Sequence, residues 1–377
     1  MIKKTLVTIF VASLGGSVLA NPTMDAAVAA NVRGDYAAEL RITRRLAENG
    51  AAWAQAFLGE SFRIGQGVTQ DQAEAVKWFR LAAAQGLGSA QFNLGVMYAN
   101  GQGVAQDYAE AAKWYRLAAA QGDAVAQLSL GVMHTQGQGV AQDHAEAVKW
   151  YRLAAAQGLA IARYNLGFMY AHGQGVVQDY AEAAKWYHLA ATQGRANAQF
   201  NLGLMYAMGQ GVPQDHAEAV KWFRMAAEQG DASAQVKLGV RYASGRGAPR
   251  NHAEAAKWFR LAAAQGDASA QHNLGLIYAN GLGVERNYAE AAKWFRLAAV
   301  QGDAVAQGNL GVIYAMGQGV AQDYVKAYLW FHLAGTHGHA DGARNRDIAI
   351  RLMTPQQVAE AQKLSSDCLA RKLMGCD

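Results

Sequence analysis

A glycine-rich loop that recurs along the chain is the first feature whose residue types could bind a ligand. One copy is Gly101-Gln102-Gly103, within the stretch FNLGVMYANGQGV of residues 92 to 104. A dinucleotide-binding fingerprint needs G-x-G-x-x-G between a strand and a helix, whereas Gln106 stands at the third glycine and a helical pattern precedes the loop. Asp107 would also compete with a phosphate for the amides at the start of the next helix. We therefore interpret the loop as a structural turn.

Histidine could supply metal ligands or transfer protons at two places. One recurring position holds either histidine or tyrosine: His144, His216 and His252, or Tyr108, Tyr180, Tyr288 and Tyr324. A ladder of metal ligands is one interpretation, but the exchange with tyrosine favours a partly buried stacking role. The only local cluster is His332, His337 and His339. Because the chain contains no H-E-x-x-H, S-x-x-K, S-D-N or K-T-G motif, we predict no catalytic residue, no metal and no cofactor.

Tryptophan recurs every 36 residues, at Trp78, Trp114, Trp150, Trp186, Trp222, Trp258, Trp294 and Trp330. Leu-Gly pairs keep the same register, from Leu58-Gly59 to Leu310-Gly311. Eight repeats therefore run from Ala51 to Gly338. A fixed period of this length is typical of a solenoid in which each repeat contacts mainly its neighbours. Positions in each repeat are numbered from 1, beginning at Ala51, Leu87 and so on.

Each repeat is predicted to be a hairpin of two helices, A and B. In the repeat that begins at Leu87, helix A is expected from about Ser89 to Asn100 and is ended by the glycine turn. Asp107 is predicted to cap helix B, with Glu110 completing a capping box. The predicted packing residues of helix B are Ala109, Ala111, Trp114, Leu117 and Ala118, and its predicted solvated residues are Glu110, Lys113 and Arg116.

The residues that carry the period, A-x-x-x-L-G-x-x-Y-x-x-G-x-G-V-x-x-D-x-A-E-A-x-K-W-x-R-L-A-A-x-Q-G, resemble the Sel1-like repeat, a relative of the tetratricopeptide repeat. The resemblance covers residues 51 to 338. It implies an all-α, right-handed α/α superhelical solenoid and an adaptor role in which the curved surface holds other proteins. Residues 21 to 50 are expected to form a degenerate N-terminal cap. Residues 339 to 377 are expected to form C-terminal capping helices, after a last repeat that departs from the pattern at Val325, Lys326, Leu329 and His337.

Residues 1 to 20, MIKKTLVTIFVASLGGSVLA, have the pattern of a secretory signal peptide: a basic start, a short apolar stretch and small residues before a cleavage site. We expect cleavage after Ala20 and a periplasmic or secreted protein. Loss of Lys3 and Lys4 lowers the formal charge from +5 to +3. The remaining excess is spread along the chain, whereas a nucleic-acid-binding protein should show a clustered basic face.

Cys368 and Cys376 are the two cysteines of the chain. A disulfide is chemically permitted in an exported protein. Inside one continuous helix, eight residues would separate the two by about 12 Å, which is too far for a disulfide. A bond therefore requires the helix to break, which Gly375 allows, and the sequence leaves both states open.

Helix A varies between repeats at positions 3, 6, 7, 10 and 14, which fall within an arc of roughly 120°. By resemblance to tetratricopeptide arrays, this arc lines the concave surface. Position 6 reads Ala56, Phe92, Leu128, Tyr164, Phe200, Val236, His272, Gly308. Position 7 reads Phe57, Asn93, Ser129, Asn165, Asn201, Lys237, Asn273, Asn309. Asparagine is a mediocre helix former, so its recurrence at position 7 calls for a reason.

We predict that the asparagines hold the main chain of an extended peptide, because an amide offers both a donor and an acceptor. Phe92, Tyr164 and Phe200 would form pockets for its side chains. Resemblance to peptide-binding tetratricopeptide proteins, which use asparagines at the matching place, implies the same. The alternative is structural: position 6 packs against the neighbouring repeat, and the asparagines bond across repeats to stiffen the solenoid.

The function that these patterns favour is a non-enzymatic, exported interaction scaffold, in the periplasm of a Gram-negative cell. We expect a protein or peptide partner, no nucleic acid, no more than peripheral membrane association, and a monomeric chain. The alternative is a cell-envelope protein that binds or processes peptidoglycan or β-lactam-like ligands, as the resemblance implies for a cysteine-rich exported branch. This chain lacks the cysteine pair that each repeat of that branch carries.

Overall fold

The computed structural model describes residues 26–27, 29–30, 32–371, 373 and 375–376. All regular structure in these residues is helical, without a strand. The predicted signal peptide and its cleavage site lie outside them. The chain divides into two compact units, an N-terminal segment up to Leu189 and a C-terminal segment from Ala190, and each is described by itself. The expected all-α solenoid is confirmed.

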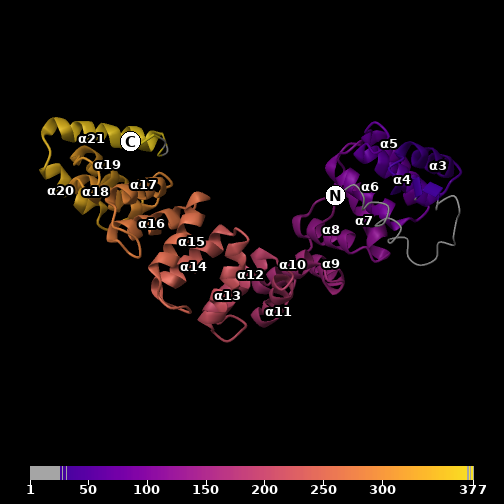
Figure 1. The fold of residues 1–377 in the computed structure, drawn as a ribbon, viewed down its shortest axis with the longest axis horizontal. Coiled ribbons are helices and arrows are strands. Elements are labelled where there is room, and N and C mark those ends of the chain that lie inside the picture. The colour runs from indigo at the N-terminus through magenta and orange to yellow at the C-terminus, as the bar shows by residue number, and fades with distance from the viewer. Residues whose placement is uncertain (1–25, 28, 31, 372, 374, 377) are drawn as a thin grey trace. The chain divides into compact units, whose positions relative to one another are not determined.

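In the N-terminal segment the helices follow one another as consecutive hairpins (Figure 1). They are α3 (Tyr36–Glu48), α4 (Ala52–Ile64), α5 (Gln72–Ala84), α6 (Gly88–Asn100), α7 (Tyr108–Ala120), α8 (Ala124–Gln136), α9 (His144–Ala156), α10 (Ala160–His172) and α11 (Tyr180–Ala191). From α4 onward, even-numbered helices are helix A of a repeat and odd-numbered helices are helix B. Helix α3 packs against α4 on the N-terminal side.

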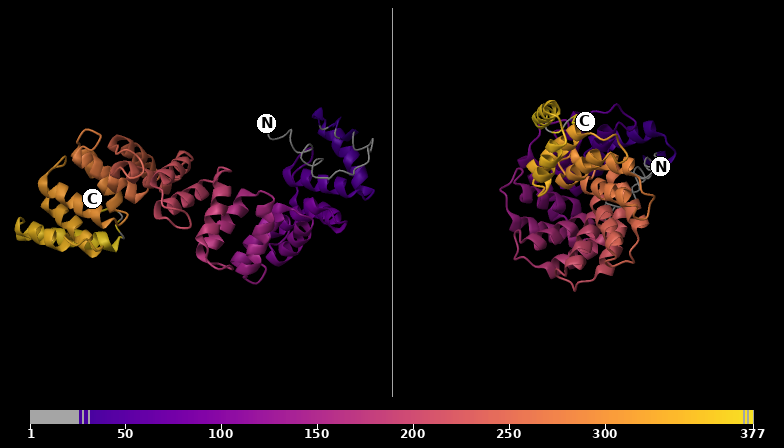
Figure 2. Two further views of the ribbon diagram at one scale, coloured as in Figure 1. Left: turned by 90° about the horizontal axis from the view of Figure 1, so that it is seen from below. Right: turned by 90° about the vertical axis from the view of Figure 1, so that its left-hand side faces the viewer.

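The C-terminal segment continues the same pattern and ends in two further helices (Figures 1 and 2). Its helices are α12 (Ala196–Met208), α13 (His216–Glu228), α14 (Ala232–Ser244), α15 (His252–Ala264), α16 (Ala268–Asn280), α17 (Tyr288–Ala299), α18 (Ala304–Met316), α19 (Tyr324–Thr336), α20 (Gly342–Arg351) and α21 (Pro355–Ala370). Both α20 and α21 pack against α19.

The glycine loop has the structural role that its pattern predicts. Gly101 adopts a left-handed conformation, with φ of 66°, and ends α6, which glycine does without steric cost. Gly103 lies directly on the start of α5 in the preceding repeat, where a β-carbon would collide with the carbonyl oxygen of Gln72. The loop therefore joins two helices and also touches the neighbouring hairpin.

Two details of the predicted helix B are wrong. Ala109 and Leu117 are exposed, Leu117 to 48%, whereas Tyr115 and Ala112 are buried. The buried stripe runs through Ala111, Tyr115 and Ala118, and at 100° per residue Leu117 points away from it. The capping box is also incomplete: Asp107 accepts a hydrogen bond from the Glu110 amide at 3.0 Å, but the Asp107 amide donates to the Tyr98 carbonyl and the Glu110 carboxylate accepts from Lys113.

Buried glutamines, and not asparagines, provide the recurring hydrogen bonds between successive repeats. Gln91 of α6 donates from Nε2 to the carbonyl oxygen of Ala83 at 3.2 Å. Gln121, at the end of helix B in the same repeat, donates to Oε1 of Gln91 and to the carbonyl oxygen of Gly86, both at 2.8 Å. Gln271 and Gln301 repeat this arrangement in the C-terminal segment. These bonds satisfy polar groups that the close packing of hairpins removes from water.

The last repeat departs from the pattern because the capping helices cover it. Leu329, Trp330 and Leu333 of α19 are buried in one core with Ala361 and Cys368 of α21. In the first seven repeats the position of Leu329 is an exposed lysine. The structure joins Cys368 to Cys376, with a Cα–Cα distance of 5.3 Å. The chain leaves the helix between them, since α21 ends at Ala370 and Gly375 has a φ of 65°.

Candidate functional site

The residues that vary between repeats form one surface on each helix A. We call positions 3, 6, 7, 10 and 14 of helix A the variable face. Positions 10 and 14 are half-buried or exposed in every repeat from α6 to α18. Apolar side chains are among the most exposed, including Val125 at position 3, Val240 at position 10 and Met208 at position 14. Positions 10 and 14 therefore present side chains that the hairpin core leaves at least partly exposed, whereas position 6 is buried at Ala56 and Val236.

The aromatic side chains at position 6 are half-buried, with one side against their own repeat. The ring of Phe92 lies 5.8 Å from that of Tyr115, centroid to centroid. The rings of Tyr164 and Tyr187 are 5.6 Å apart, and those of Phe200 and Phe223 are 5.9 Å apart. Each pair is tilted, a favourable geometry for aromatic rings. Position 6 thus contacts helix B of its own hairpin and leaves part of the ring in solvent.

The asparagines at position 7 are all half-buried, and their hydrogen bonds differ. Asn273 donates from Nδ2 to the carbonyl oxygen of Ser269, one turn earlier, at 2.7 Å. Burial raises the pKa of Tyr151, and hydrogen bonds with Thr135 and Asn165 oppose that shift. The Nδ2 atom of Asn309 is buried and has no hydrogen-bond partner in the described part of the chain.

Asn93 and Asn201 carry no side-chain hydrogen bond to any residue that the structure describes. Of the five predicted asparagines, only Asn165 contacts a neighbouring repeat through its amide, at Tyr151. The glutamines at other positions already provide the recurring bonds between hairpins. The amide groups of Asn93 and Asn201 are therefore available to a ligand, whereas the Nδ2 atom of Asn309 is buried.

The three C-terminal histidines make separate contacts. Nδ1 of His337 lies 2.9 Å from Oε1 of Gln307, so His337 takes the place of the glutamine at its position. His332 stacks on Tyr328. His339 packs over Gly308, where a β-carbon added to the glycine would lie 3.4 Å from the nearest atoms of the His339 ring. Burial lowers the pKa of His332, and the Arg346 charge lowers it further. Across residues 26–376, as far as they are described, no three His, Cys, Asp or Glu side chains are grouped to hold a metal ion.

The position shared by His144, His216 and His252 lies at the start of helix B. The second loop glycine of the following repeat packs on the backbone there, as Gly175 does on His144 and Gly247 on His216. The Nδ1 atoms of these three histidines are buried and have no partner among the described residues. The position is thus part of a contact between neighbouring hairpins.

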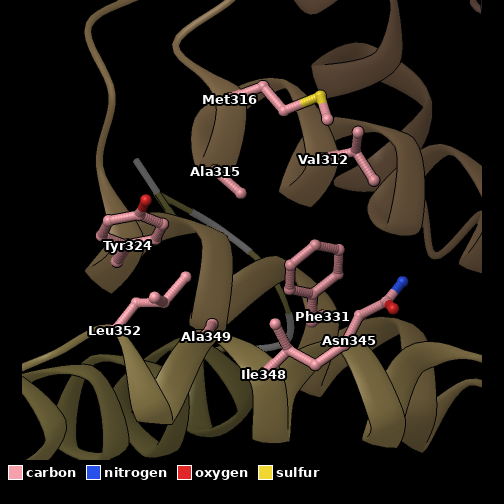
Figure 3. Close-up of a pocket in the computed structure, with 9 residues that line it drawn as sticks. All are labelled: Val312, Ala315, Met316, Tyr324, Phe331, Asn345, Ile348, Ala349 and Leu352. Atoms are coloured by element: carbon pink, nitrogen blue, oxygen red, sulfur yellow. The ribbon is translucent and has the colours of Figure 1, made fainter.

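An apolar cavity of about 150 Å³ between α18, α19 and α20 was not predicted from the sequence. Figure 3 shows Val312 and Met316 of α18 on one side of it, Ile348 of α20 and Leu352, the residue after α20, on the other, and Phe331 of α19 between them. One signal in the sequence could have indicated it. Position 14 holds Met316 in this repeat but a polar residue in five others, namely Asn100, Gln136, His172, Ser244 and Asn280.

None of the helices in the described residues has the length and apolar character needed to cross a membrane.

The chain is similar to known repeat proteins over most of its length. The family model described as Sel1 repeat matches residues 54–87, 88–123, 124–159, 160–194, 196–231, 232–267, 268–303 and 304–339. A protective antigen of uropathogenic Escherichia coli with an SLR fold is 34% identical, with a TM-score of 0.60; the match covers 97% of this chain and 84% of that one. A Sel1 repeat protein from Oxalobacter formigenes is also 34% identical, with a TM-score of 0.64, over 81% of this chain and 88% of that one. No curated protein matches the chain.

Proposed function

The chain belongs to the Sel1-repeat family, whose members are generally protein-interaction scaffolds, and from this premise we propose that it is an exported, non-enzymatic scaffold. The variable face binds an extended segment of a partner protein. The asparagines at position 7 hold the partner's main chain, and the aromatic residues at position 6 contact its side chains.

The observation that carries this proposal is that two free amide groups, those of Asn93 and Asn201, each lie beside a half-exposed ring. Asn93 follows Phe92, and Asn201 follows Phe200, so each pair offers a polar and an apolar contact at one place. Asparagine costs helix stability relative to alanine, and these two amides make no compensating hydrogen bond to the described residues. A ligand backbone, which carries one donor and one acceptor per residue, would satisfy such an amide in either segment.

Substitution of the asparagines, one segment at a time, tests the proposal. One variant carries Asn93→Ala and Asn165→Ala, and a second carries Asn201→Ala and Asn273→Ala. A partner is first captured on the mature wild-type protein from an envelope extract and identified by mass spectrometry, and its affinity for each purified variant is then measured. Each lost hydrogen bond contributes about 0.5 to 1.5 kcal/mol, so each double variant, which loses two, is expected to bind at least roughly fivefold more weakly.

A matched variant with Lys113→Ala and Lys149→Ala removes two exposed side chains of helix B and is expected to bind normally. If both asparagine variants bound the partner as tightly as the wild type, the peptide-binding proposal would be wrong. Specific binding of a fluorescent penicillin would favour the envelope-ligand alternative instead. Export is tested separately, by N-terminal sequencing of the protein recovered from the periplasm, where we expect Asn21 as the first residue.

A further inference from the structure

The cavity at the C-terminal end lies where the repeat pattern stops. Helix α20 follows α19 in the place where helix A of another repeat would begin, and it packs against α19. Between α18 and α20 the cavity of about 150 Å³ stays open (Figure 3).

This cavity is continuous with the variable face. Val312 and Met316, which line it from α18, are at positions 10 and 14 of the last repeat. Met316 is 64% exposed, and Leu352, which follows α20, is 55% exposed. Ile348 and Val312 are also exposed. These four apolar side chains therefore surround one opening and are all accessible to a ligand from solvent.

The lining of the cavity selects an apolar group. No charged side chain lines it, and Asn345 supplies the one amide there. A cavity of about 150 Å³ lined by apolar side chains accepts a benzene-sized ligand. One phenylalanine or leucine side chain of a bound polypeptide has the right size and chemistry.

Charged residues of α20 near the cavity indicate which kind of residue would lie next to the bound apolar side chain. Arg344, Ile348 and Arg351 are spaced i, i+4 and i+7 on α20 and so lie along one stripe. Ile348, which lines the cavity, therefore lies between two arginine positions on this stripe. Arg344 has an exposed ion pair with Asp341, at 2.8 Å, which is weak in solvent. Arg351 is exposed and pairs with no acidic residue in the described part of the chain.

We propose that this cavity anchors one bulky apolar side chain of the partner polypeptide, and that Arg344 and Arg351 attract a carboxylate next to it. The inference rests on the proposed function, because it names a feature of the segment that the variable face would bind. It commits to a protein segment with an aromatic or leucine residue beside an acidic one.

Methyl NMR on the full-length mature protein tests the cavity without the natural partner. The probes are the blocked dipeptides acetyl-Phe-Asp-amide, acetyl-Phe-Lys-amide and acetyl-Ala-Asp-amide, and the reporters are the labelled methyl groups of Met316 and Ile348. Acetyl-Phe-Asp-amide is expected to shift both methyl signals and to bind about threefold to fivefold more tightly than acetyl-Phe-Lys-amide. Acetyl-Ala-Asp-amide should leave both signals unchanged.

Two variants and a matched control make the result specific. Val312→Phe fills the cavity and should abolish the shifts, whereas Val240→Phe makes the same change at position 10 of another repeat, at similar exposure, and should leave them intact. Arg351→Glu keeps the cavity and should reverse the preference between the Asp and Lys dipeptides. Absence of shifts with acetyl-Phe-Asp-amide on the wild type would overturn the inference, as would equal shifts in Val312→Phe. Normal dipeptide binding together with unaltered partner affinity in the asparagine variants would instead overturn the proposed function alone.

Discussion

Gly95 of α6 lies directly against the ring of Tyr115 of α7, so that a β-carbon at Gly95 would come within 2.7 Å of Cδ1 of Tyr115. The same pair closes the other hairpins, for example Gly131 with Tyr151 and Gly203 with Phe223. This close approach explains why the Leu-Gly pair keeps its register in all eight repeats. The two helices can meet at this distance only where one of them has no side chain.

The variant Gly95→Ala is expected to lower the stability of the protein, although alanine is the better helix former by about 1 kcal/mol. Overpacking against the buried ring costs about 1 to 3 kcal/mol, and we expect a net loss of about 1 kcal/mol, seen as a lower midpoint in urea unfolding. Gly88→Ala is the matched control in the same helix. Most other repeats carry alanine there, so this variant should be at least as stable as the wild type.

The Tyr115 hydroxyl should make the free energy of unfolding depend on pH in the alkaline range. Burial raises the pKa of Tyr115 to about 12, above the value of about 10 in an unfolded chain. The unfolded state therefore loses the proton first as pH rises, so the contribution is fully present below pH 10 and is lost between about pH 10 and 12. It amounts to about 2 to 3 kcal/mol.

Comparison with Tyr115→Phe isolates this contribution from other titrating groups. Phenylalanine occupies the same position in several repeats, as Phe79 and Phe259, so the variant should fold normally. Its stability should exceed that of the wild type increasingly from pH 10 to 12. A constant difference over that range, measured by urea unfolding, would contradict the burial of the hydroxyl.

The glutamine bonds between hairpins should be sensitive to loss of one partner. Gln91→Leu removes the donor to Ala83 and the acceptor for Gln121, and it leaves the buried Ala83 carbonyl without its side-chain donor. We expect a loss of about 1 to 3 kcal/mol in urea unfolding. Gln102→Leu, in the exposed loop, should change stability by less than about 0.5 kcal/mol. Equal losses of stability in the two variants would argue against a stabilising role of the Gln91 hydrogen bonds.

The disulfide should stabilise the C-terminal cap. Cross-linking two cysteines eight residues apart lowers the conformational entropy of the unfolded chain, which stabilises the folded state by about 2 to 3 kcal/mol. Reduction should therefore lower the melting temperature of the wild type and expose the apolar residues of α19 that α21 covers. The Cys376→Ser variant should melt at the temperature of the reduced wild type and be insensitive to reductant. A wild type that melts identically with and without reductant would show that the bond contributes nothing.

Much of the fold could be predicted because its contacts recur at a fixed, short distance along the chain. The tryptophan period, the glycine turns and the asparagine or aspartate caps each specify a local step, and the helices begin and end close to the predicted residues. The prediction of the buried residues of helix B was wrong where two neighbouring residues were both apolar and only one could face the partner helix. Tyr115, and not Leu117, faces Gly95, because the partner helix decides which stripe of α7 is buried.

The candidate site was predictable only in part, for the same reason. Variation between repeats identifies the variable face, and it places Phe92 next to Asn93. It does not indicate that the ring of Phe92 packs against Tyr115. It also does not indicate that glutamines provide the recurring hydrogen bonds between hairpins, so that the Asn93 amide stays free.

The sequence by itself therefore determined the repeating unit of this protein, since most repeats within each segment make the same kinds of contact, such as the Gly95–Tyr115 and Gln91–Gln121 pairs. Only the tertiary structure decided what happens at the end of the array, where no period applies. There α21 buries Leu333, whose counterparts such as Leu117 are exposed, and α20 leaves the cavity beside Met316 open. Those outcomes depend on how non-repeating helices pack against the last repeat, which no pattern in the sequence specifies.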